Sequence, residues 1–168
     1  YAEKNWGAGF PDEWWWGQAQ GFDDRDLCVA FGGGRLRGGP VVVDITGCVV
    51  RIGDEVLRFA PPLAVVRSSV GDRVWQITAR RPGWRIQVEG DGSKGLPSVL
   101  PVPLPAERRN VDRDLEHLAG SLRLRVWRSG HLVVDDCSEL AALEVGSTDP
   151  GRAAALADEH GVGAVRVG

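Results

Sequence analysis

Apolar and polar residues alternate along most of the 168-residue chain, in short runs bounded by Gly, Pro and Asp. The run 84–89 places Trp84, Ile86 and Val88 on one side, and the run 122–126 turns its two arginines to the other. Such half-buried alternation is typical of antiparallel strands. We therefore predict extended segments or strands at 14–20, 26–31, 41–44, 47–52, 56–59, 64–70, 73–79, 84–89, 122–126, 131–135 and 140–145.

Turn-forming residues separate these runs. The glycine-rich segment 32–39 predicts a turn or loop; it lacks the Gly-Lys-Ser/Thr ending of a phosphate-binding loop. We also expect a surface loop across the proline-rich segment 96–105 and the charged segment 107–116. One helix is predicted over 149–160, with Asp149 as its N-cap, Pro150 in its first turn and Gly161 after its end.

Many short strands and one late helix predict a mainly β protein built as a closed antiparallel barrel or a sandwich. The length suits a single domain. A net charge of −3 gives no basic footprint for nucleic acid or an anionic membrane surface. Three widely spaced cysteines favour reduced thiols and a cytoplasmic location, and no apolar run approaches the ~18 residues of a membrane span.

The histidines His117, His131 and His160 lack the spacing of metal ligands, so we predict no metal site and expect them in loops or in solvent. The acids of the segment 107–116 are expected to be solvated. Glu144 stands between Leu143 and Val145 in a predicted strand, so its side chain is a candidate to point into the barrel.

The first twenty residues hold four of the seven tryptophans, and they predict two extended segments joined by a turn at 9–13. With period two, Tyr1, Glu3 and Asn5 share a face of the first segment. Trp14, Trp16, Gln18 and Gln20 share a face of the second. If both faces point inward, they line an aromatic pocket that holds one carboxyl group and several amides.

These residues carry a family resemblance. The motif Glu3-Lys4-Asn5-Trp6-Gly7, with Phe10-Pro11 and Trp14-x-Trp16-x-Gln18, resembles the signature of the tocopherol cyclase family. A second block resembles the same family: Gly120-x-Leu122-Arg123-Leu124-x-x-Trp127, then Ser138 and Ala141-Ala142-Leu143-Glu144-Val145-Gly146. Glu3-x-Asn5-x-Gly7 is also similar to an Asp-x-Asn-x-Gly motif of carotenoid hydratases, which share the fold.

The resemblance implies a lipocalin-like barrel over residues 1–147, followed by a helix and tail over 148–168. It implies an enzyme, an intramolecular lyase of vitamin E biosynthesis, that closes a chromanol ring on a prenylated hydroquinone by protonating the prenyl double bond, without cofactor or metal. A second lipocalin-like half is expected in the full-length protein, with possible peripheral membrane contact to reach an isoprenoid or prenylquinol ligand.

For this chemistry we expect Glu3 to be the catalytic acid, assisted by Asn5. The residues expected to contact the substrate are Tyr1, Trp14, Trp16, Gln18, Gln20 and Glu144. Other interpretations stay open. Glu3 can instead form a structural ion pair with an arginine, and the tryptophans can simply pack the barrel. The chain can also be a lipid-binding barrel without chemistry, a hydratase of an isoprenoid double bond, or a structural half whose inner face is packed.

Overall fold

A computed structural model describes residues 10–94, 97–104 and 108–152, and these form ten strands of one antiparallel sheet. The strands are β1 (Glu13–Gln20), β2 (Leu27–Gly38), β3 (Val41–Ile52), β4 (Glu55–Phe59), β5 (Val65–Val70), β6 (Val74–Arg81), β7 (Trp84–Asp91), β8 (Ser98–Leu104), β9 (Arg109–Arg128) and β10 (His131–Ser147). Their order is β4-β3-β2-β1-β10-β9-β7-β6-β5, and β8 pairs with the first half of β9. The predicted mainly β, antiparallel class is confirmed.

The predicted closure into a barrel is not observed. In the described residues no backbone ladder joins β4 to β5, the two outer strands of the order. The chain leaves β4 through Pro61 and Pro62, which have no N–H group with which to extend a ladder. Side chains bridge this gap instead: Thr46 Oγ1 on β3 lies 2.9 Å from Ser68 Oγ on β5. The sheet is therefore curved and open.

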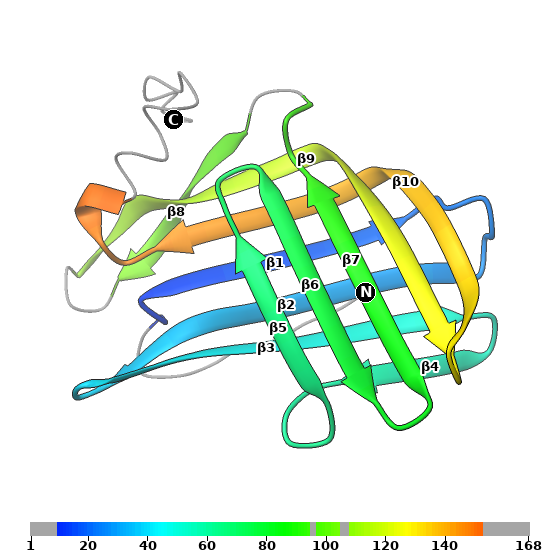
Figure 1. Cartoon of the computed structure of the whole chain (residues 1–168). Helices are drawn as coiled ribbons and strands as arrows, with labels where there is room; N and C mark the ends of the chain where they lie inside the picture. The colour runs from blue at the N-terminus through cyan, green and yellow to red at the C-terminus, as the bar shows by residue number, and fades with distance from the viewer. Residues whose placement is uncertain (1–9, 95–96, 105–107, 153–168) are drawn as a thin grey trace.

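The core lies between two parts of this one sheet. Figure 1 shows β5, β6 and β7 crossing in front of β1, β2 and β3, while β9 and β10 connect the two parts. Fully buried side chains come from both: Phe31, Val50, Leu57, Phe59, Trp75, Ile77, Ile86, Leu122, Leu124 and Leu143. Burying each large apolar side chain stabilises the fold by roughly 1.5–3 kcal/mol.

Glycines of β2 lie opposite the tryptophans of β1. Trp14, Trp15 and Trp16 pair in register with Gly34, Gly33 and Gly32. A Cβ atom at Gly33 would lie 2.4 Å from Nε1 of Trp15 and 2.6 Å from the backbone oxygen of Ile45, which is closer than atoms can pack. The expected loop over 32–39 is therefore wrong up to Gly38, because these residues belong to β2, where Gly33 makes room for the Trp15 ring.

The expected surface loop over 96–105 and 107–116 is also wrong in its described part. Residues 98–104 form β8, which pairs antiparallel with 109–116 of β9. Pro101 and Pro103 fit there because β8 is an edge strand, where a missing N–H costs no ladder bond on the open side. The predicted strands within 41–52 and 131–145 are likewise parts of the longer strands β3 and β10.

His117 departs from its expected exposed position. It lies on β9 with only 2% of its surface exposed, and its Nδ1 is 2.9 Å from the carbonyl oxygen of Gly92. Its ring meets the Trp75 ring edge-on, with centroids 5.4 Å apart. Aromatic packing and a backbone hydrogen bond make this a core histidine.

The start of the predicted helix follows β10. Asp149 Oδ1 accepts hydrogen bonds from the backbone N–H groups of Gly151 (2.7 Å) and Arg152 (3.1 Å), as an N-cap does. The remainder of the predicted helix, 153–160, lies outside the described residues. Within the described part of the chain, no helix has the length and apolarity to cross a membrane.

The fit of glycine to tryptophan predicts a position-specific stability effect. Gly33→Ala should lower the free energy of unfolding by about 1–3 kcal/mol, because the added methyl group overpacks the contact with Trp15 and with the backbone of β3. Gly38→Ala in the same strand is the matched control, since its Cβ would meet nothing within 4 Å. Urea unfolding measures both, and equal losses would contradict the steric explanation.

Candidate functional site

The two faces of β1 have different surroundings. Trp15 and Ala19 belong to the main core, and Gly17 shares their face. A Cβ atom at Gly17 would meet the Phe31 ring at 2.4 Å, so the core fills that side completely. Trp14, Trp16, Gln18 and Gln20 therefore lie on the outer face of the sheet. The predicted inward orientation of Trp16 and Gln18 is wrong, and so is that of Glu144, whose neighbours Leu143 and Val145 take the core side of β10.

A second, smaller apolar cluster covers this outer face. Trp14 packs there against Val102 and Leu104 of β8, with Val111 of β9 beside them. The Phe10 ring adds a contact at a centroid distance of 5.1 Å. The irregularity between Leu100 and Pro101 shifts the register of the β8–β9 pair. The β8–β9 hairpin thus buries an indole on a face that alternation alone would leave in solvent.

Glu144 is held from both sides of the sheet. Its carboxylate oxygen Oε1 accepts a hydrogen bond from Trp14 Nε1 at 2.9 Å on the outer side. Its backbone oxygen accepts one from Trp75 Nε1, a core residue, at 3.0 Å. In register it lies between Trp16 of β1 and Glu116 of β9. The carboxyl group is therefore fixed beside two indole side chains.

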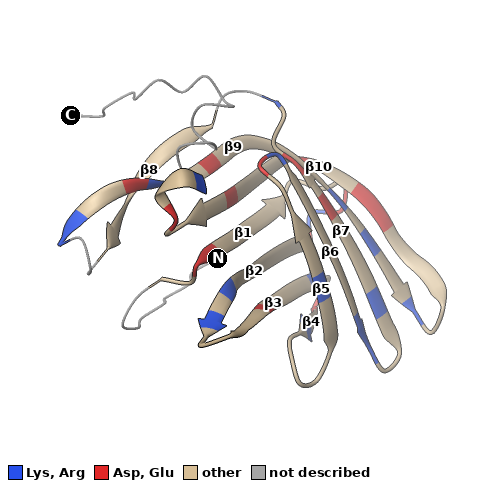
Figure 2. Cartoon of the chain, turned by 60° about the vertical axis from the view of Figure 1, so that its left-hand side comes forward, with Lys and Arg blue, Asp and Glu red and all other residues tan. Residues whose placement is uncertain are grey.

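Asp114 is the buried acid of this cluster. It pairs in register with Gly146, which lies two residues after Glu144 on β10. Only 7% of its surface is exposed. Figure 2 shows acidic positions on β9 and β10 at the end of the sheet that β8 covers. Among the described residues its Oδ1 atom has no hydrogen-bond partner.

Burial raises the pKa of Asp114 to about 8, because desolvation disfavours the carboxylate. The negative charge of Glu144 raises that pKa further, a hydrogen bond from Trp14 opposes the shift, and Glu116 adds a smaller increase. A hydrogen bond with Glu144 also favours the protonated form of Asp114. The two carboxyl groups therefore act as a pair that keeps one proton near neutral pH.

The structure brings together only some of the sequence-predicted site residues. Trp14, Trp16 and Glu144 are neighbours, and Gln18 is half-buried on the same face. Gln20 is exposed at the far end of β1, where its backbone oxygen accepts a hydrogen bond from Ser138. The predicted residues Tyr1, Glu3 and Asn5 lie outside the described residues.

Sequence reasoning missed Asp114 by treating the segment 107–116 as a solvated loop. The available signal was the spacing of Asp114 and Glu116, which puts both on one face of a strand if the segment is extended. Within the described chain, no three His, Cys, Asp or Glu side chains are grouped as metal ligands. What the site offers chemically is a protonated carboxyl group, a neighbouring carboxylate and indole rings.

Comparison with known proteins gives one family. The family described as tocopherol cyclase-like matches residues 1–147. The tocopherol cyclase (chloroplastic) of Zea mays is 25% identical over 157 residues, covering 87% of this chain and 33% of that protein. The probable tocopherol cyclase (chloroplastic) of Oryza sativa subsp. japonica is 28% identical over 157 residues, which again cover 87% of this chain and 33% of that protein. The chain thus spans about a third of the length of these relatives. No solved structure matches it.

The raised pKa of Asp114 predicts a pH-dependent stability. The folded-state pKa lies above the unfolded value of about 3.9, so the folded protein binds more protons than the unfolded chain between roughly pH 4 and 8. The free energy of unfolding should therefore fall as pH rises through this window, by up to about 1.4 kcal/mol per pH unit. Asp114→Asn, which keeps the volume and removes the titration, should flatten that slope.

The matched control is Asp54→Asn, a change at an exposed acid in the β3–β4 turn, which should leave the slope as in the wild type. Urea unfolding at pH 5, 6, 7 and 8 measures all three proteins. A wild-type slope that persists in Asp114→Asn would show that Asp114 is not the buried acid responsible.

Proposed function

Since the chain belongs to the tocopherol cyclase-like family, we propose that it provides the proton-donating site of an enzyme that closes a chromanol ring on a prenylated hydroquinone. The observation that carries the proposal is the buried Asp114, whose raised pKa keeps it protonated beside Glu144 and the indoles of β1. Protonating an isolated double bond needs a donor group that still carries its proton at neutral pH and that is shielded from water. A carboxyl group in an apolar setting meets both needs.

In the first step, the carboxyl proton of Asp114 adds to the prenyl double bond nearest the ring. The C=C π bond breaks, a C–H bond forms at the less substituted carbon, and a tertiary cation remains at the other. Asp114 becomes a carboxylate, close to Glu144. The Trp14 and Trp16 ring faces stabilise the cation by their negative electrostatic potential.

In the second step, the phenol oxygen of the hydroquinone attacks the tertiary cation and forms the C–O bond of the chromanol ring. The phenol proton passes to the carboxylate pair, which restores the starting protonation state. Substrate and product are isomers, so the cycle consumes no redox equivalent. One carboxyl pair thus provides both the acid and the base.

Positioning and shielding complete the proposal. Gln18, on the Trp14 face, and Asn5 are proposed to hydrogen-bond the hydroquinone hydroxyl groups, which sets the oxygen against the correct carbon. Tyr1 would add a further polar contact. Contact with Val102 and Leu104 suits the isoprenoid tail, at ~0.8 kcal/mol for each buried methylene. Glu3 remains a second proposed proton donor.

The test is product analysis with a prenylated hydroquinone, using the longest natural form of the protein that contains this chain. Asp114→Asn should lower chromanol formation at least 100-fold, because a general acid typically contributes 10²- to 10⁴-fold. Glu3→Gln and Glu144→Gln, measured in parallel, rank the three acids. Asp54→Asn is the matched control, and unfolding midpoints confirm that each variant is folded.

The other outcomes separate the alternatives. Full chromanol formation by Asp114→Asn together with loss in Glu3→Gln would move the proton donor to Glu3. A tertiary alcohol in place of the chromanol would identify a hydratase, in which water captures the cation. No product from the wild type, with prenylquinol binding retained, would identify a binding protein.

A further inference from the structure

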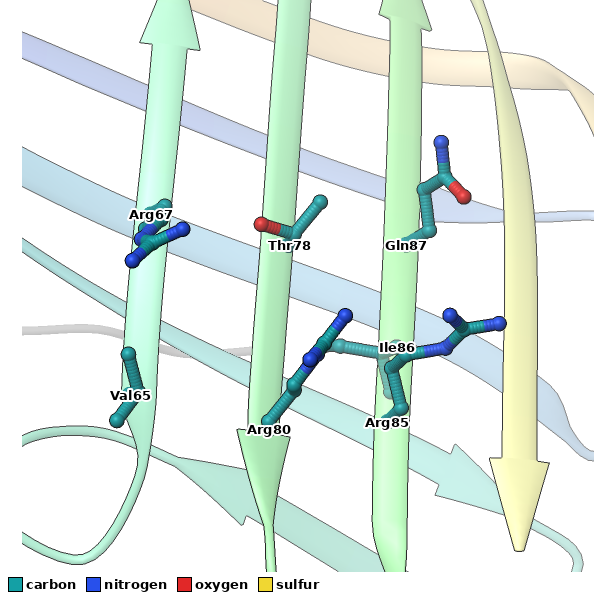
Figure 3. A pocket seen from close by; sticks show the side chains of 7 residues that line it. All are labelled: Val65, Arg67, Thr78, Arg80, Arg85, Ile86 and Gln87. Carbon is teal, nitrogen blue, oxygen red and sulfur yellow. The ribbon is translucent and has the colours of Figure 1, made fainter. Parts of the chain in front are cut away.

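A hollow of about 480 Å³ lies on the outer face of the sheet at β5, β6 and β7, far in sequence from the carboxyl pair. Figure 3 shows that Arg67, Thr78, Arg80, Arg85 and Gln87 line it, while Ile86 closes its floor from the core side. The five polar side chains of this hollow therefore all come from β-strands. Nothing in the proposed ring closure uses them.

The pairing register sets these side chains in two rows. Arg67 lies opposite Thr78, which lies opposite Gln87. In the next row, Arg80 lies directly opposite Arg85. Alternation turns all five to the same face, while Ile77, Ala79 and Ile86 take the buried side. Three arginine side chains, the hydroxyl of Thr78 and the Gln87 amide, which is hydrogen-bonded to Glu89 and Arg125, thus line a single hollow.

The positive charges of this hollow are not neutralised within the described chain. Arg67 and Arg80 form no ion pair with any described residue, and Arg85 stacks on the Trp127 ring at 3.6 Å from its centroid. Arginines on neighbouring strands behave differently: Arg123 pairs with Asp135 at 2.7 Å and Arg125 with Glu89 at 3.0 Å. Glu89, two residues after Gln87 on the same face of β7, is therefore already engaged by Arg125.

Like charges directly opposite each other on neighbouring strands destabilise a sheet. The opposed Arg80 and Arg85, with Arg67 beside them, concentrate positive charge on a protein whose net charge is −3. An anion in the hollow would relieve this repulsion. The net charge argues against anionic partners for the protein as a whole, but positive charge is concentrated at this hollow.

We propose that this hollow binds a phosphate group through Arg67, Arg80 and Arg85. Guanidinium groups match the oxygens of phosphates and carboxylates with paired hydrogen bonds. Three of them, with the hydroxyl of Thr78, present more donors than the two oxygens of a carboxylate can use. A tetrahedral oxyanion has enough acceptors and enough charge. The phosphate can belong to a free phosphate ester or to a phospholipid headgroup.

The first experiment titrates the ¹⁵N-labelled protein with inorganic phosphate, against sodium chloride at equal ionic strength. Phosphate should shift the backbone amides of β5–β7 and the Nε–Hε signals of Arg67, Arg80 and Arg85, with saturation. The triple variant Arg67→Gln, Arg80→Gln, Arg85→Gln should bind more than about tenfold more weakly, because each lost charged hydrogen bond contributes to affinity.

Two control variants keep the test specific. Arg58→Gln removes an exposed arginine of β4 that also has no ion pair in the described chain but lies outside the hollow, and it should bind phosphate as the wild type does. The double variant Arg67→Gln, Arg80→Gln preserves the stacking of Arg85 on Trp127 and should still lose most of the affinity. Unfolding midpoints establish that both remain folded.

A second experiment identifies the source of the phosphate. Co-flotation with phosphatidylglycerol vesicles, but not with phosphatidylcholine vesicles, that is lost in the triple variant would assign the hollow to an anionic lipid headgroup. Phosphate binding without flotation would assign it to a free phosphate ester. The proposal is wrong if neither probe binds, if the triple variant binds as the wild type does, or if Arg58→Gln loses as much affinity.

Discussion

The close fit of two indole rings, those of Trp14 and Trp15, against glycine backbone is the constraint from which the rest of this structure follows. Trp14, Trp15 and Trp16 are consecutive, so a strand must turn their side chains to alternate faces. Each face then has to accept a ring next to a neighbouring strand, and glycine is the residue that leaves the space. Gly33 does so on the core side and Gly146 on the outer side, where a Cβ would lie 2.1 Å from the Trp14 ring.

The two faces of β1 therefore have different roles in the structure. The core side is filled, since Trp15, Gly17 and Ala19 pack beneath Phe31 and Leu143. The outer side becomes the place where apolar cover and acidic groups meet. Glu144 ties the two together, because Trp75 holds its backbone from the core and Trp14 holds its carboxylate from outside. One member of the acid pair is thereby bonded both to the core and to the outer cluster.

Local alternation was enough to predict strands wherever one face of the sheet is buried throughout, as in 84–89 and 122–126. It failed where a residue's role depends on a distant strand. The glycines 32–34 predicted a turn, because nothing near them in the sequence shows that Gly33 accommodates the Trp15 ring. Pro101 and Pro103 predicted a loop, because only the strand order of the whole sheet shows that their strand lies at an edge. The sequence predicted a solvated Asp114, because its burial depends on the β8–β9 hairpin folding over β1.

The contact between Thr46 and Ser68 has a mechanical consequence. Thr46 Oγ1 also accepts a hydrogen bond from Trp15 Nε1 at 3.1 Å, so one short polar chain links β1, β3 and β5 across the place where no ladder exists. Separating any two strands that are neighbours in the strand order would break a row of backbone hydrogen bonds. Here side chains alone hold the two edges together in the described chain: this hydroxyl contact, the shared core and Arg81 of β6 over the Phe59 ring of β4 at 5.3 Å. The sheet therefore has a seam that is closed by side-chain packing and not by backbone hydrogen bonds.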